Sequence, residues 1–254
     1  ASDVYKRQKY MGSKTNILDF IMTGISEVYT DGSKVVDLFA GSATLSGALR
    51  GHASVISNDI QVYSKVLAEA YLTSYDWGSN ANAIEDIIQE ATAKYEELIE
   101  LNEVDTSEFQ YNDSLTVEQF NKIEKAQQKL IEKKNWIGEY YLFAKNYSGT
   151  YWNYHQCVWI DAYKYVADHY SNQSLRPAIM AALMFAMSYN AQSTGHYAQY
   201  RDAGNEKSMK DILIYRQKEI TPFVRRKLTE LRDAMPHTQD LSLIHISEPT
   251  RQEA

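Results

Sequence analysis

The feature that most constrains the fold is a short apolar strand that runs into a turn of small residues. Val35 to Phe39 is an apolar run interrupted only by Asp37, and Gly41-Ser42-Ala43 comes shortly after it. A helix-compatible segment begins at Thr44. This order predicts a strand, a tight turn and a helix. Such a turn lets a ligand approach the backbone, and the start of the helix offers free N–H groups.

A second strand is predicted at residues 54–57, and it ends at Asn58-Asp59. An acidic residue in this place can accept hydrogen bonds from ribose hydroxyls, so the two segments predict half of a nucleoside-binding α/β unit. On the residues alone, Asp37 could equally be a solvated strand-end or helix-capping carboxylate, and Asp59 a turn residue. Ala43 interrupts the G-x-G-x-x-G spacing of a dinucleotide site, which disfavours a nicotinamide dehydrogenase.

Three motifs carry a resemblance to a known family. They are KYMGSK at residues 9–14, DLFAGSATLSG at residues 37–47 and SNDI at residues 57–60. In this order and spacing they resemble the adenine-N6-specific DNA methyltransferases of the Dam-like class. Fainter similarity continues to about residue 217, through SGTYW at residues 148–152 and STGHYAQ at residues 193–199.

The resemblance implies an α/β fold with a partial Rossmann-like class I methyltransferase core, and S-adenosylmethionine as the cofactor. In the family, an aromatic residue and a lysine of the first motif contact the cofactor, the DLFAGSAT turn wraps its methionine end, and the acidic residue of SNDI holds its ribose. The expected cofactor-binding residues are Tyr10, Lys14, Asp37, Phe39, Gly41, Ser42 and Asp59.

Composition excludes several classes of protein. The single cysteine, Cys157, excludes a disulfide framework and a cysteine-based zinc cluster, and we expect no metal. There is neither a run of eighteen apolar residues nor a signal-peptide pattern, so we expect a cytoplasmic protein that does not enter a membrane. The net charge of −7 is unevenly distributed: residues 84–132 hold 13 acidic and 4 basic residues, whereas residues 205–232 hold 8 basic and 4 acidic ones. The second region can therefore face phosphate.

Both ends resemble translated adapters of sequencing libraries. These are residues 1–8 and 241–254, so native sequence is expected only from about residue 9 to residue 240. The family's Asp-Pro-Pro-Tyr catalytic motif is absent, because no two of the 4 prolines are adjacent. In the subgroup that this chain resembles, the motif follows the target-recognition region. We therefore expect a fragment that ends before its catalytic segment and has no methyltransferase activity of its own.

The expected organisation has three parts between these ends. Residues 9–76 form the cofactor-binding core, residues 77–135 an inserted acidic helical hairpin, and residues 136–240 a helical target-recognition region. Thr116 and Gln119 match a capping box, which predicts the start of the second hairpin helix. We interpret the hairpin as a solvated scaffold in preference to a partner-binding surface.

The target-recognition region offers several candidate DNA contacts. Aromatic residues surround the loop Ser148-Gly149-Thr150, which suits either a pocket for an extruded base or a packed helix end. The loop at residues 193–199 suits either a base contact or a structural role. The basic residues between 205 and 232 suit either phosphate contact or a solvated helix face. The candidate contacts are Tyr151, Trp152, His196, Lys207, Arg225 and Arg226.

The resemblance therefore implies a site-specific methyltransferase of restriction–modification or phage type. Its substrate would be double-stranded DNA with a flipped adenine, methylated at the exocyclic N6, and a cognate restriction endonuclease is a further candidate partner. Two alternatives remain open. One is an S-adenosylmethionine-dependent methyltransferase acting on RNA or a small molecule, and the other is a non-catalytic DNA-binding protein on the same fold.

Overall fold

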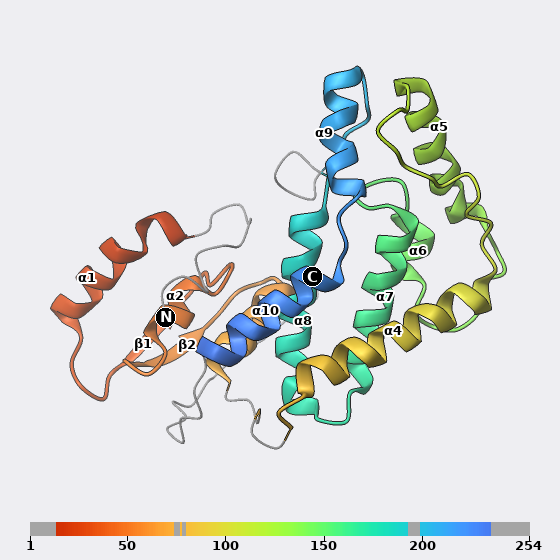
Figure 1. Cartoon of the computed structure of the whole chain (residues 1–254). Coiled ribbons are helices and arrows are strands. Elements are labelled where there is room, and N and C mark those ends of the chain that lie inside the picture. Colours follow the sequence, from red (N-terminus) through yellow and green to blue (C-terminus); the bar gives the residue numbers. More distant parts are fainter. Residues whose placement is uncertain (1–13, 74–76, 78–79, 193–198, 235–254) are drawn as a thin grey trace, which may run out of the picture. The chain divides into compact units, whose positions relative to one another are not determined.

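The computed structural model describes residues 14–73, 77, 80–192 and 199–234, which fall into two compact units (Figure 1). The first unit comprises the described residues up to 77 together with residues 228–234, and the second is Asn80–Lys227. Helices predominate throughout. The only sheet in the described ranges is a parallel pair of strands in the first unit.

The first unit is built around a βαβ arrangement. Its elements are η1 (Lys14–Ile17), α1 (Leu18–Val28), β1 (Lys34–Asp37), α2 (Thr44–Leu49), β2 (Ser54–Ser57) and α3 (Val62–Leu72). The two strands run parallel, with Lys34 opposite Ser54 and Asp37 opposite Ser57. α2 connects them and packs against both β2 and α3. The predicted order of strand, turn, helix and strand is confirmed.

One prediction about the first strand is wrong. The apolar residues from Val35 to Phe39 predict a buried parallel strand, but Val36 is 49% exposed and Phe39, just beyond the strand, is 80% exposed. Asp37 is the buried residue of β1. In the part of the chain that the structure describes, β1 pairs with β2 alone, so its side chains lack the cover of a wider sheet. Of the expected α/β core, the described residues contain this one βαβ unit.

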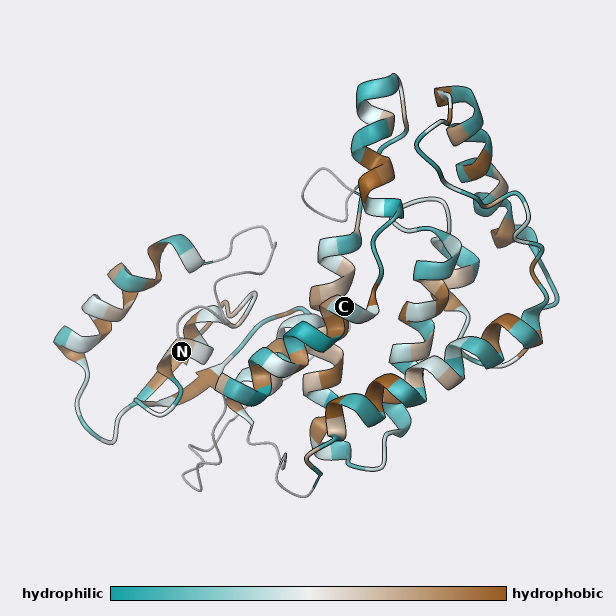
Figure 2. Ribbon diagram, in the orientation of Figure 1, coloured by the Kyte–Doolittle hydropathy of each residue, from teal (hydrophilic) through white to brown (hydrophobic). Residues whose placement is uncertain are grey.

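The second unit is helical and is arranged around α7. Its elements are α4 (Ala83–Asn102), α5 (Val117–Gln128), η2 (Lys129–Glu132), α6 (Leu142–Asn146), α7 (Tyr154–His169), η3 (Gln173–Leu175), α8 (Arg176–Asn190), α9 (Glu206–Arg216) and the first part of α10 (Thr221–Ala234). α7 packs against α4, α6 and α8. Figure 2 shows α4 with brown apolar and teal polar faces, as expected for a helix with one side on a core.

The expected hairpin differs from the observed arrangement of α4 and α5. α4 packs chiefly along α7, whereas α5 contacts η2 and α9, and all of these elements belong to the second unit. α4 buries apolar residues such as Ile84 and Ile87, so a larger apolar partner than the polar α5 is required. The predicted capping box is confirmed: the Gln119 N–H donates to Thr116 Oγ1 at 3.2 Å, and the Thr116 N–H to Gln119 Oε1 at 2.9 Å.

Candidate functional site

The carboxyl ends of β1 and β2 bring together two segments that the sequence analysis linked. The Asp59 carboxylate accepts the Gly41 N–H at Oδ2 (2.8 Å) and the Gln61 N–H at Oδ1 (2.9 Å). Backbone bonds continue the strand pairing beyond β1, since the Ala40 N–H donates to Asn58 O at 3.0 Å. Asp59 thus ties the small-residue turn to the end of the second strand.

The turn itself holds two residues in the left-handed conformation. Gly41 has φ +53°, and a side chain added there would meet no atom within 4 Å, so the turn has open space beside it. Ala43 is fully buried and also left-handed, with φ +55° at the start of α2. This conformation costs a non-glycine residue roughly 1–2 kcal/mol. Backbone held in this way is typical of sites where a ligand approaches the chain closely. The Ser42 hydroxyl faces inward, 2.8 Å from Thr44 Oγ1.

A lysine and a buried carboxylate lie beside the turn. Lys14 Nζ is 3.1 Å from Asp37 Oδ1 and also donates to the Phe39 carbonyl oxygen. Asp37 is 4% exposed, and its Oδ2 has no hydrogen-bond partner among the residues that the structure describes. Leaving a buried acceptor unsatisfied costs roughly 1–3 kcal/mol. A ligand that carries a donor can therefore gain binding free energy at Asp37.

Exposed apolar side chains lie next to these polar groups in the sequence. Phe39 and Ile60 are each 80% exposed, and they come shortly after the ends of β1 and β2. Large exposed apolar side chains at strand ends are typical of ligand sites. We refer to Lys14, Asp37, Phe39, Gly41 and Asp59 as the strand-end cradle. Tyr10 lies outside the described residues.

In the second unit, the loop of residues 148–152 joins α6 to α7. The Gly149 N–H donates to Trp152 O at 2.8 Å, which closes the loop on itself. Trp152 is 2% exposed, and its Nε1 donates to Met187 O at 3.2 Å. Trp152 is therefore a core residue, and the structure does not present it to a base. Tyr151 is partly exposed, and its ring makes an edge-to-face contact with the ring of Tyr200 at 6.0 Å.

The basic residues of the last helices divide into buried and exposed groups. Arg216 and Lys227 are 3% and 1% exposed, so neither of the alternatives left open for the basic residues of this region, phosphate contact or a solvated helix face, fits these two. Lys207 is exposed in the first turn of α9. Arg225 is exposed and paired with Glu85. The exposed Arg226 guanidinium lies 5.6 Å from the Phe185 ring. His196 lies outside the described residues.

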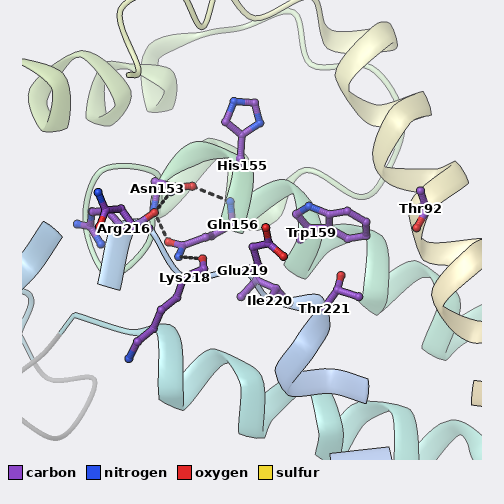
Figure 3. A pocket seen from close by; sticks show the side chains of 11 residues that line it. Thr92, Asn153, His155, Gln156, Trp159, Arg216, Lys218, Glu219, Ile220 and Thr221 are labelled. Carbon is purple, nitrogen blue, oxygen red and sulfur yellow. Dashed lines mark hydrogen bonds between the residues drawn. The ribbon is translucent and has the colours of Figure 1, made fainter. Parts of the chain in front are cut away.

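A pocket of about 470 Å³ opens between the start of α7 and the segment after α9 (Figure 3). Figure 3 shows Arg216 at one end of its lining and Thr92 at the other. Tyr95 Oη is 2.7 Å from His155 Nδ1, and burial lowers the pKa of His155. The Gln156 amide on its wall donates to the carbonyl oxygen of Tyr215, in the last turn of α9, and to that of Lys218, just after α9, which holds the end of α9 against α7. The sequence analysis did not predict this pocket.

Comparison with known proteins identifies the family. The profile of the D12 class N6 adenine-specific DNA methyltransferases matches residues 10–222. The chain belongs to this family. The modification methylase LlaI of Lactococcus lactis subsp. lactis is 41% identical over 64 residues, which are 25% of this chain and 10% of that protein. The matched segment therefore spans only a small part of that relative. No solved structure matches the chain significantly.

The strand-end cradle and the loop of residues 148–152 both lie inside the range that the family profile matches. Across the described ranges, no three His, Cys, Asp or Glu side chains gather in a group that could hold a metal ion. No described helix is long and apolar enough to cross a membrane.

A buried carboxylate sets the position of α6, which leads into the loop. Asp161 accepts the Phe143 N–H at 3.0 Å and the Ala144 N–H at 2.8 Å, and the Ser148 hydroxyl donates to Ala144 O at 2.6 Å. Burial raises the pKa of Asp161 from 3.8 to about 7, although the two N–H groups lower it relative to burial alone. Asp161 therefore makes the stability of the second unit depend on pH.

We expect the free energy of unfolding to fall as the pH rises from about 4 to about 7, because the folded state keeps a proton that the unfolded chain releases. The whole effect is on the order of 4 kcal/mol. Asp161→Asn abolishes this titration, so the difference in unfolding free energy between wild type and variant should change across the window. Urea denaturation at several pH values measures it, with the exposed Glu132→Gln as the control. A difference that stays constant with pH would contradict the prediction.

Proposed function

We propose that the strand-end cradle binds S-adenosylmethionine and that the protein takes part in methyl transfer to the N6 of adenine in DNA. The observation that carries the proposal is the Asp59–Gly41 bond across the ends of two parallel strands, next to the Lys14–Asp37 pair. A Rossmann-like class I methyltransferase core begins with this βαβ unit, and its ligands bind outside the carboxyl ends of the strands.

The cradle residues fit the chemical groups of this cofactor. Each carboxylate oxygen of Asp59 accepts one backbone N–H. Each oxygen therefore has a further lone pair that can accept a hydrogen bond from a ribose hydroxyl. Within the described ranges the Asp37 Oδ2 lacks a donor, which an ammonium group can supply, and Lys14 can pair with a carboxylate. Phe39 offers an exposed aromatic face for a base. The bound cofactor would supply an activated methyl group.

The helical unit would hold the DNA. Tyr151 is the candidate for stacking on a flipped adenine, and the exposed Lys207, Arg225 and Arg226 are candidates for phosphate contact. Methyl transfer to an amino group does not demand a strong base, since the proton can leave after attack. Positioning and electrostatics therefore supply most of the catalysis. We place the protein in the cytoplasm, as the modification enzyme of a restriction–modification system with a cognate endonuclease.

Two binding measurements on this chain test the proposal. Calorimetry should show S-adenosylmethionine and its demethylated product binding in the micromolar range, well ahead of nicotinamide dinucleotides. Fluorescence polarisation should show tighter binding to a DNA duplex with an unpaired adenine than to a fully paired duplex, since an unpaired base avoids the cost of flipping. Binding should also be tighter than to a duplex with an unpaired cytosine, because the proposed target base is adenine.

The outcomes separate the alternatives. Cofactor binding without DNA binding would favour a methyltransferase that acts on RNA or a small molecule. DNA binding without cofactor binding would favour a non-catalytic protein on the same fold. A chain that binds neither S-adenosylmethionine nor its product would overturn the assignment of the strand-end cradle.

A further inference from the structure

A buried ion pair lies behind the loop that carries Tyr151. The Arg216 side chain is fully buried and that of Glu124 is 8% exposed. The pairing is bidentate: Arg216 Nε donates to Glu124 Oε1 at 2.9 Å, and Nη2 to Oε2 at 2.5 Å. The two residues lie on α9 and α5, which are far apart in the sequence. An arginine that is buried and paired in this way is unavailable to phosphate.

Arg216 also binds the backbone of the loop. Its Nη1 donates to Tyr151 O at 2.9 Å and its Nη2 to Thr150 O at 2.6 Å. The preceding carbonyl oxygen, that of Gly149, accepts from Gln128 Nε2 at 2.7 Å. Three successive carbonyl groups are thus held by side chains from α5 and α9. A planar guanidinium has the fork of donors needed to bind a carboxylate and two carbonyls together.

The carboxylate side of the pair is also fully engaged. Tyr111 Oη donates to Glu124 Oε1, and Gln127 Nε2 donates to Tyr111 Oη at 2.6 Å. Gln127 in turn accepts the Tyr154 N–H at 2.6 Å, at the start of α7. Burial and the adjacent Glu124 carboxylate raise the pKa of Tyr111, so its hydroxyl stays protonated and remains a donor. The network is rigid because nearly every polar atom in it has a fixed partner.

The same network reaches a second loop. Tyr151 O, which accepts from Arg216, also accepts the Gln192 N–H at 3.0 Å. Gln192 Oε1 accepts the Arg201 N–H at 3.1 Å, and the Tyr200 ring lies against the Tyr151 ring. Residues on either side of the segment predicted to contact DNA, 193–199, are therefore joined to the loop of residues 148–152 through one carbonyl group.

We propose that Glu124 and Arg216 are positioning residues that set Tyr151 and the two ends of the 193–199 segment in one arrangement for contact with an unpaired adenine. This inference rests on the proposed function. Stability alone accounts poorly for such a pair, because replacing a buried ion pair with apolar side chains is often neutral or stabilising. Arg216 also donates hydrogen bonds to two loop carbonyl groups, which apolar side chains cannot do.

The test compares variants of the whole chain. The double variant Glu124→Met/Arg216→Met removes both charges and leaves no unpaired ion, so it can fold. Arg216→Lys keeps the charge but loses the fork of donors. Arg176→Met is the matched control, because Arg176 pairs with Asp168 at 3.1 Å without holding the loop. Unfolding free energy, S-adenosylmethionine affinity, affinity for a duplex with an unpaired adenine, and amide hydrogen exchange at Tyr151 and Gln192 are measured for each.

We expect the double variant to fold, to bind S-adenosylmethionine like the wild type and to lose at least tenfold in DNA affinity. Its Gln192 amide should exchange at least tenfold faster. Arg216→Lys should share the loss of DNA affinity, and Arg176→Met should not. Adding Tyr151→Ala to the double variant should cost little more, because both changes act through the same side chain.

Unchanged exchange at Gln192, or unchanged DNA affinity in the double variant, would overturn the inference. Wild-type affinity in Arg216→Lys would also overturn it, since charge alone would then suffice. A wild-type chain that binds neither S-adenosylmethionine nor DNA refutes the proposed function instead. In that case the exchange rate of Gln192 still decides whether Arg216 orders the two loops.

Discussion

Gly149→Ala is expected to destabilise the second unit by about 2–5 kcal/mol, enough to unfold a marginally stable domain. Gly149 has φ +71°, where an alanine costs roughly 1–2 kcal/mol. Its Cβ would lie 2.3 Å from Glu124 O and 3.0 Å from Gln127 Cβ. The first of these atoms belongs to the backbone of α5, so the loop or the helix has to move. Overpacking of this kind typically costs a further 1–3 kcal/mol or so.

Gly138→Ala is the matched control for this substitution. Gly138 has φ +86°, but a Cβ there would meet nothing within 4 Å. Gly138→Ala should therefore lower the free energy of unfolding only by the conformational cost of the alanine, about 1–2 kcal/mol. Urea denaturation followed by circular dichroism gives both free energies, and their difference isolates the close approach to Glu124. Equal losses in the two variants would show that the loop is not packed against α5 in the way described.

The local elements of this chain could be predicted from the sequence because short-range chemistry decides them. The small-residue turn between Asp37 and Thr44 permits only a tight reversal into a helix, and the structure has one. The capping box of Thr116 acts within a single helical turn. The position of Asp59 after a strand predicts a role at the strand ends, and the structure joins it to Gly41 there.

Which distant segments of the chain pack together could not be predicted, because the same residue pattern is compatible with several packing partners. Arg216 lies in a basic stretch of the sequence, as expected of a phosphate contact. Nothing near it in the sequence indicates that it is buried in an ion pair with Glu124. Trp152 stands among aromatic residues that suit a base pocket equally well, yet it packs in the core. α4 has an apolar face that could have met α5 but packs along α7. In each case the deciding contact comes from a distant segment.

Asp59→Ala is expected to weaken S-adenosylmethionine binding by about a hundredfold, which corresponds to roughly 3 kcal/mol. The carboxylate is the charged acceptor proposed for the ribose, and hydrogen bonds to charged groups contribute roughly 1.5–3 kcal/mol each. Asp59→Asn should be nearly as damaging, because its amide group would face the N–H of Gly41 or of Gln61, both of which the carboxylate now accepts. Calorimetric titration of the two variants measures the losses.

The control for Asp59 has to separate ligand binding from local folding, since the same carboxylate holds the turn. Asp31→Ala removes an exposed carboxylate from the turn before β1 and should leave the affinity within about twofold, as expected for a surface site. Thermal unfolding of Asp59→Ala, monitored without ligand, gives the structural part of its effect. If the variant still folds cooperatively and has lost the cofactor, Asp59 contacts the ligand. Binding at wild-type strength in a folded Asp59→Ala protein would move the cofactor site away from the ends of β1 and β2.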